Sequence, residues 1–143
     1  MEKLRYTNSN ASFFILEQVQ AMSYTDILVS AHGAQLTNII FMSPGRRIME
    51  IFPGGWLEYA GQGQYVYKNL VSWIGLHHEG FWRDPSTTPC PNPNDFKACC
   101  SYYKNQPIGL NETHIGTWLA SVISKFKATP LPGQPTNTCE CPN

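Results

Sequence analysis

Residues 26–53, DILVSAHGAQLTNIIFMSPGRRIMEIFP, constrain the fold more than any other part of the chain. The apolar run Ile27-Leu28-Val29 is typical of a strand buried on both faces, and small residues after it permit a sharp turn. A helix is expected over residues 34–41, ended by a Ser-Pro-Gly sequence, and a second strand over residues 47–52. This order predicts a right-handed βαβ unit with parallel strands.

The turn after the first strand is the leading candidate for a binding site. Ligands of parallel sheets bind at the carboxyl ends of the strands, which is where His32, Gly33 and Ala34 are expected. The imidazole of His32 and the N–H groups of Gly33 and Ala34 predict a site for an anion such as a diphosphate. The alternative is a buried histidine that holds the turn.

Glu50 is the second candidate, because it stands inside the apolar strand. A buried carboxylate is costly unless it is paired or hydrogen-bonded, and the hydroxyls of a ribose would serve. Alternatively Glu50 faces solvent, or pairs with Arg46 or Arg47, which are expected to be surface loop charges.

The composition excludes several other classes of protein. At 143 residues the chain is one domain or part of one, and ten basic and ten acidic residues cancel. No global field therefore favours nucleic acid or an anionic membrane surface. No apolar run approaches the ~20 residues needed to span a bilayer, and the polar residues 1–10 do not read as a signal peptide.

The cysteines predict an oxidising compartment, because none falls in the paired CxxC spacing of a zinc site. The five are Cys90, Cys99, Cys100, Cys139 and Cys141. A bridge from Cys90 to Cys99 or to Cys100 would contribute roughly 2 to 3 kcal/mol by closing a loop. Asn10 and Asn111 begin N-glycosylation triplets, and Asn137 begins the rarer cysteine form.

Patterns elsewhere predict further elements. Helices are expected over residues 11–24, 65–75 and 111–127, a last short strand within residues 73–84, and loops over residues 54–63 and 85–100. Several aromatic residues either stack on a base or sugar or belong to the core: Trp56, Tyr59, Tyr65, Tyr67, Trp73 and Trp82.

Other catalytic and metal-binding patterns are weak or missing. His77-His78-Glu79 does not predict a metal site, because adjacent strand residues point to opposite sides and the spacing fixes no third ligand. The GxGxxG and GxSxG motifs are absent, and no cysteine stands beside an evident base.

Three motifs together resemble the C-terminal signature of glycosyltransferase family 61. They are HGAQLTN at residues 32–38, FMSPG at residues 41–45 and MEIFP at residues 49–53. The similarity continues to about residue 126 and is greatest to the plant branch, which includes xylan-decorating xylosyl- and arabinosyltransferases. The family also includes an EGF-domain O-GlcNAc transferase and an O-mannose N-acetylglucosaminyltransferase.

The resemblance implies a fold and a domain division. The expected fold class is α/β, the C-terminal part of a Rossmann-like GT-B domain that binds a nucleotide sugar on a parallel sheet flanked by helices. Residues 11–128 are expected to form this part, after a disordered lead-in at residues 1–10 and before a Pro/Cys-rich tail at residues 129–143.

The resemblance also implies a function: an inverting glycosyltransferase that moves a sugar from a UDP-sugar to a hydroxyl of a glycan or glycoprotein. His32, Gly33 and Ala34 would bind the donor diphosphate, and Glu50 the ribose or the sugar. The general base is expected in a missing N-terminal part, so this fragment alone is expected to be inactive. No metal and no cofactor besides the donor substrate are implied. The expected location is the Golgi or endoplasmic reticulum lumen, with a membrane anchor in the longer chain; a non-catalytic binding module is the alternative.

Overall fold

The computed structural model describes residues 15–86 and 88–129 of the chain. The lead-in expected at residues 1–10, the start of the first expected helix and nearly all of the expected tail lie outside these ranges. The same holds for Asn10, Asn137, Cys139 and Cys141, so the predictions made for them stay predictions.

A parallel three-stranded sheet forms the centre of the molecule. Its strands β1 (Ile27–Ala31), β2 (Arg47–Phe52) and β3 (His77–Arg83) lie in the order β1-β2-β3. Val29 pairs with Met49, and a register shift between β2 and β3 falls between Ile48 and Glu50. The expected α/β class with a parallel sheet is confirmed, and β3 lies within the segment predicted to hold a short strand.

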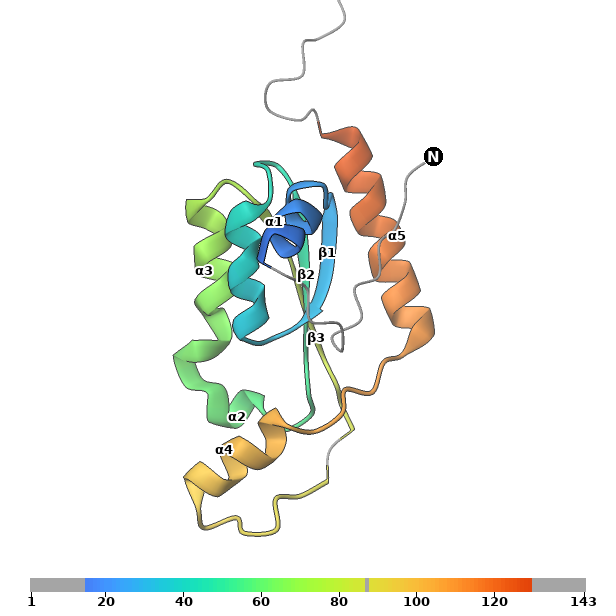
Figure 1. Cartoon of the computed structure of the whole chain (residues 1–143). Coiled ribbons are helices and arrows are strands. Elements are labelled where there is room, and N and C mark those ends of the chain that lie inside the picture. The colour runs from blue at the N-terminus through green and yellow to red at the C-terminus, as the bar shows by residue number, and fades with distance from the viewer. Residues whose placement is uncertain (1–14, 87, 130–143) are drawn as a thin grey trace, which may run out of the picture.

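Helices cover the sheet on both sides (Figure 1). On one side lie α1 (Ile15–Ser23), the 3-10 helix η1 (Ala34–Phe41) and α3 (Val66–Trp73), and on the other lies α5 (Glu112–Ala128). The helix expected over residues 34–41 is present, in the tighter 3-10 form. The core under η1 and α3 is built by Leu36, Ile39, Met42, Ile48, Tyr67, Val71 and Leu76.

The connection from β2 to β3 is more helical than expected. The short helix α2 (Leu57–Ala60) and the 3-10 helix η2 (Gly61–Tyr65) precede α3. The prediction of a loop over residues 54–63 is therefore wrong for most of that segment, because a glycine costs a helix only about 1 kcal/mol and a short turn tolerates it.

A second correction concerns helix α4 (Phe96–Lys104), whose first five residues were expected in a loop. The prolines of that segment all precede Asp95, whose side chain caps the helix by accepting the N–H of Ala98 at 2.9 Å. A disulfide joins Cys90 to Cys99, the first of the two expected pairings, and Cys100 has no disulfide partner within residues 15–86 and 88–129. In Figure 1, α4 lies beyond the carboxyl ends of the strands.

Helix α5 is tied to the sheet by hydrogen bonds to a buried ion pair between β2 and β3. Arg47, expected on the surface, is only 5% exposed and pairs with Glu79, which also accepts a hydrogen bond from Lys125 at 2.9 Å. Burial raises the pKa of Glu79, but the hydrogen bonds from Lys125 and Arg47 outweigh it and hold that pKa below the ordinary value. The indole N–H of Trp118 adds a bond to the carbonyl of Glu79 at 3.1 Å.

Candidate functional site

Glu50 is the centre of a polar cluster inside the sheet. It is fully buried, and each carboxylate oxygen accepts a bond from a different histidine. Nδ1 of His32 donates to Oε1, and Nε2 of His78 donates to Oε2 at 2.9 Å. Arg46 pairs with Asp26 and Arg47 with Glu79, so neither reaches Glu50. Both alternatives considered for Glu50, exposure to solvent and pairing with one of these arginines, are therefore wrong.

The hydrogen bonds fix where the protons sit. An ionised carboxylate can only accept, so Nδ1 of His32 and Nε2 of His78 both carry hydrogen. The N–H of Gly80 donates to Nδ1 of His78 at 3.2 Å, so both ring nitrogens of His78 are used within the fold. The second ring nitrogen of His32 is Nε2. No hydrogen bond among the described residues uses Nε2.

Burial and hydrogen bonding act in opposite directions on Glu50. Burial raises the pKa of this carboxyl, whereas the hydrogen bonds from His32 and His78 lower it. The histidine bonds prevail, and the pKa of Glu50 lies below its ordinary value. Glu50 thus stays ionised at neutral pH and holds both imidazole rings in a fixed orientation.

His32 lies at the carboxyl end of β1, as predicted. Its N–H donates to the carbonyl of Ile51 at 2.8 Å, which extends the parallel ladder by one step. Its ring stacks on Phe52, with 4.6 Å between centroids, and packs against Trp56 at 4.7 Å and Tyr67 at 5.2 Å. The side chain is 11% exposed, so a narrow part of the ring remains accessible.

The turn itself joins His32 to η1. Gly33 is extended, and its carbonyl accepts the N–H of Leu36 at 3.0 Å. Ala34 and Gln35 are exposed at the start of η1, where the first N–H groups of a helix have no intrahelical acceptor. The structure thus places His32, Gly33 and Ala34 together at one edge of the sheet, and connects Glu50 to them through the His32 ring.

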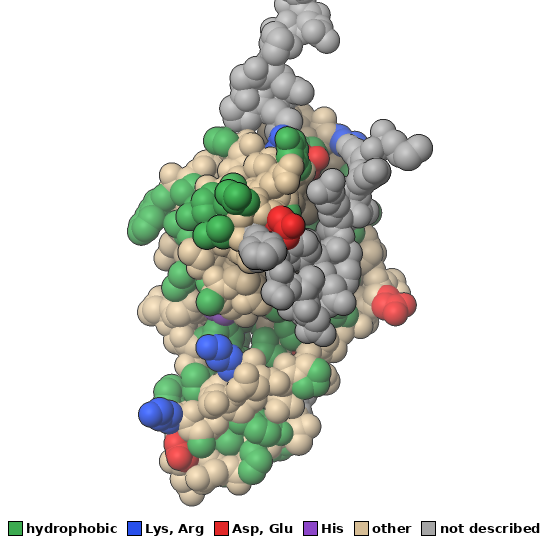
Figure 2. All heavy atoms as spheres, viewed as in Figure 1, with side chains coloured by type: hydrophobic (Ala, Val, Ile, Leu, Met, Phe, Trp, Pro, Cys, Tyr) green, Lys and Arg blue, Asp and Glu red, His purple; other side chains and the backbone are tan. Residues whose placement is uncertain are grey.

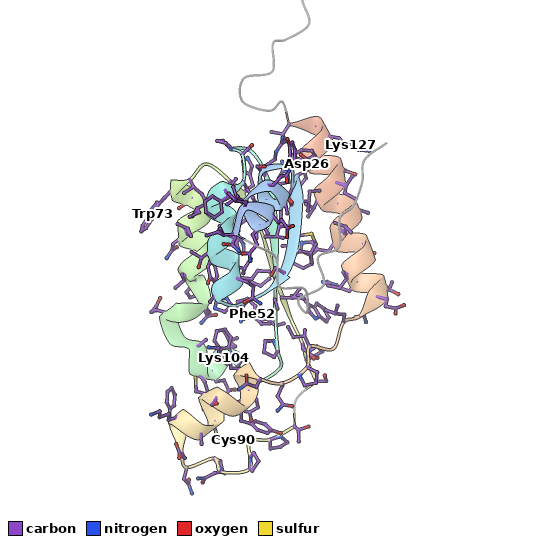
Figure 3. All side chains as sticks on the ribbon, in the orientation of Figure 1. Asp26, Phe52, Trp73, Cys90, Lys104 and Lys127 are labelled. Atoms are coloured by element: carbon purple, nitrogen blue, oxygen red, sulfur yellow. A yellow bond between two sulfur atoms is a disulfide. The ribbon has the colours of Figure 1, made fainter. Side chains whose placement is uncertain are left out.

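The surface is hollowed next to this edge. Figure 2 shows a notch between the body of sheet and helices and the part formed by α4, with histidine atoms at its border. In Figure 3, Phe52 lies at the same end of the sheet, whereas Trp73 points away from the core. The segments after β2, β3 and α4 also line an open pocket of about 220 Å³, formed by Gly54, Ser86, Thr88, Gln106 and Pro107.

His78 and Arg83 were not predicted as site residues, and Trp56 was considered only for stacking on a base or sugar. His78 was considered only as a metal ligand, although it lies opposite Ile48 and so on the same face as Glu50. Trp56 Nε1 and Arg83 Nη1 are buried donors that have no partner among the described residues. The available signal for His78 was a polar residue on the same face of the sheet as Glu50. This signal can be recognised only when the register between β2 and β3 is known.

The remaining sequence candidates are dispersed. Asn111 caps α5, with its side-chain oxygen accepting the N–H of His114 at 2.8 Å. Trp56 and Tyr67 belong to the core, whereas Trp73 is 82% exposed.

Within residues 15–86 and 88–129, no group of three or more His, Cys, Asp or Glu side chains is arranged to hold a metal ion. No helix in those ranges has the length and hydropathy to cross a membrane.

A parallel α/β sheet with polar groups gathered at its carboxyl edge is typical of proteins that bind nucleotides or phosphorylated ligands. Residues 6–49 match a family model described as Glycosyltransferase 61. The matched segment is less than a third of the chain; it contains β1, the His32 turn and η1, and ends one residue before Glu50. No curated protein and no solved structure matches the chain.

Proposed function

We propose that this chain is the donor-binding part of an inverting, UDP-sugar-dependent glycosyltransferase. The observation that carries the proposal is the match of residues 6–49 to the Glycosyltransferase 61 model, because that segment includes the turn at His32. The position of this turn at the carboxyl edge of a parallel sheet supports a ligand site there. The plant branch of the family and a GT-B arrangement are part of the proposal.

In this proposal His32 binds the diphosphate of the donor. Nδ1 is committed to Glu50, so Nε2 faces the ligand, and its protonated form donates a hydrogen bond to a phosphate oxygen. The N–H groups at Gly33 and Ala34 supply further donors. Since Glu50 is buried with both oxygens bonded to histidines, it fits a positioning role through His32 better than direct contact with ribose.

The transfer joins an acceptor hydroxyl to the anomeric carbon of the sugar. The new C–O bond forms on the face opposite the leaving group, the bond from the anomeric carbon to the phosphate oxygen breaks, and UDP departs with the electron pair. Donors around the diphosphate stabilise that charge. The hydroxyl proton passes to a general base, which we place in an acceptor-side domain outside the described residues.

One observation favours a second candidate, a nucleotide-sugar-binding module without transferase activity. Both oxygens of Glu50 and both ring nitrogens of His78 are occupied by hydrogen bonds within the fold. The cluster therefore orders the binding turn, and the one ring nitrogen it leaves free, Nε2 of His32, is the one that the proposal assigns to the diphosphate. Under either candidate we place the protein in the lumen of the Golgi or endoplasmic reticulum, with a glycan or glycoprotein acceptor for the transferase.

Titration calorimetry of the full chain with UDP tests the donor site. We expect UDP to bind, and His32→Ala to weaken the binding about tenfold or more, the effect of losing one charge-assisted hydrogen bond. His77→Ala is the matched control, because His77 is exposed at the other end of β3. Unchanged UDP binding in His32→Ala would contradict the assignment of His32 to the donor site. Sugar transfer by a longer protein that joins this chain to an acceptor-side domain would separate the transferase from the binding module.

A further inference from the structure

Two buried donors at the carboxyl edge of the sheet lack acceptors among the residues that the structure describes. They are Nη1 of Arg83 and Nε1 of Trp56, and Trp56 is only 8% exposed. A buried N–H without a partner is unfavourable, since it has lost its bond to water and gained none in return. Nε of Arg46 and of Arg47 and Nη1 of Arg46, before and at the start of β2, also lack hydrogen-bond partners among the described residues, but only Trp56 and Arg83 lie beside the His32 turn, where a bound ligand can accept their hydrogen bonds.

Arg83 is the stronger indication of an anionic ligand, because its side chain carries a full positive charge. It is the last residue of β3, paired opposite Phe52, and its guanidinium lies 4.9 Å from the ring centroid of Phe52 and 5.0 Å from that of Phe81. Nη2 donates to the neutral side-chain oxygen of Gln64 at 2.8 Å. Within the described ranges no carboxylate lies within ion-pairing distance of Arg83, so its charge is held by aromatic faces and an amide alone.

Trp56 connects this arginine to the His32 turn. Its ring packs against His32 at 4.7 Å and stacks on Phe52 at 5.6 Å, while His32 stacks on Phe52 at 4.6 Å. Indole nitrogen is a donor only, and so is guanidinium. The ring of Phe52 therefore packs against three side chains that can each donate a hydrogen bond.

We propose that Arg83 and Trp56 form a phosphate-binding subsite, in which Nη1 and Nε1 donate to oxygens of the donor's diphosphate. The inference rests on the proposed function and extends the His32 site across Phe52. Phosphate fits because its oxygens accept several bonds at once and its charge neutralises the unpaired guanidinium. The stacking of Arg83 on two rings fixes the direction of Nη1 before the ligand arrives, which reduces the ordering required on binding.

Calorimetry of the full chain with three probes, UDP, uridine and inorganic pyrophosphate, tests the subsite. Arg83→Met keeps an apolar stem over the aromatic rings and removes the donors, and Trp56→Phe keeps the ring and removes Nε1. We expect about ten- to a hundredfold weaker binding of UDP and pyrophosphate in Arg83→Met, and a smaller loss in Trp56→Phe. Arg46→Met is the control, because Arg46 also lies over an aromatic ring, Phe126 at 5.6 Å, but precedes β2 at the opposite edge.

The outcomes separate this inference from the proposed function. UDP binding that is equal in wild type, Arg83→Met and Trp56→Phe would overturn the subsite and leave the donor site at His32. Pyrophosphate binding that is lost in Arg83→Met, without any preference for UDP, would support the subsite and contradict the nucleotide-sugar donor. If neither UDP nor pyrophosphate binds the wild type, both proposals fail. If Arg83→Met does not fold, the binding of UDP and pyrophosphate to Trp56→Phe decides whether the subsite exists.

Discussion

Replacing Glu50 by glutamine keeps the shape of the side chain and removes its charge. Glu50 accepts one hydrogen bond from His32 and one from His78. A bond to a charged group contributes about 1.5 to 3 kcal/mol, and a neutral bond about 0.5 to 1.5 kcal/mol. His78 can still donate to the amide oxygen, whereas His32 must change tautomer to accept from the amide nitrogen. The loss is about 1 kcal/mol for each bond, or about 2 kcal/mol in the free energy of unfolding.

The stability difference between wild type and Glu50→Gln should depend on pH, and the lowered pKa of Glu50 determines the direction. The pKa of Glu50 is lowered from the ordinary value of 4.5 in the folded chain, so the folded state favours the ionised form more than the unfolded state does. The stabilisation is fully present above the unfolded pKa and is lost as the pH falls through the lowered folded pKa. The stability difference between wild type and Glu50→Gln should therefore be largest near neutral pH and shrink in acid.

Urea unfolding followed by tryptophan fluorescence measures the effect. With a slope of about 2 kcal/mol per molar urea, a loss of about 2 kcal/mol lowers the midpoint by about 1 M. Glu58→Gln is the control, because Glu58 is exposed on α2 and should leave the midpoint unchanged. Equal stability of wild type and Glu50→Gln at neutral pH, or a difference that persists unchanged into strong acid, would refute the reasoning.

Three further changes test the fold around the site. Replacing Cys90 and Cys99 by serine should cost roughly 2 to 3 kcal/mol, seen as a lower Tm, and reductant should then have no further effect on the transition; an unchanged Tm would contradict this. Gly54→Ala should destabilise by about 1 to 3 kcal/mol because its Cβ would overlap a backbone carbonyl after β3, whereas a Cβ at Gly63 meets nothing within 4 Å and Gly63→Ala should be much milder; equal effects would rule out the clash. Asn111→Ala should cost about 1 kcal/mol by removing the cap of α5, and Asn111→Asp should retain it while also removing the glycosylation triplet; urea midpoints that fall equally in both variants would contradict a capping role.

The sequence predicted those parts of the fold that local patterns determine. The apolar run of β1, the small turn at His32 and the strand that ends at Phe52 all gave local signals, and the structure has them in the expected order. Helix α5 was predicted to within one residue at each end, because a long apolar face repeats at helical spacing. Helix α4 was missed because prolines before Asp95 outweighed the capping signal of Asp95 itself.

The polar cluster could not be predicted, because its partners are brought together by strand pairing. His78 lies 28 residues from Glu50 in sequence, and it reaches the carboxylate only because β3 pairs with β2 in a shifted register. The adjacent arginines were the obvious partners for Glu50, but the side chain of Arg47 lies with Glu79 and α5. For the same reason, the lack of an acceptor for Nη1 of Arg83 among the described residues could be recognised only from the folded structure.

The proposed function requires the turn at His32 to bind the diphosphate of a nucleotide sugar. The chain has four histidines, His32, His77, His78 and His114, and all lie in the described residues. Histidine-selective NMR during titration with UDP tests the claim directly, because His77 and His114 are exposed elsewhere and serve as internal controls. We predict that the ring signals of His32 shift most, those of His78 less through Glu50, and the other two hardly at all. Bound UDP that leaves the His32 signals unmoved, or that shifts mainly His77 or His114, would contradict the account.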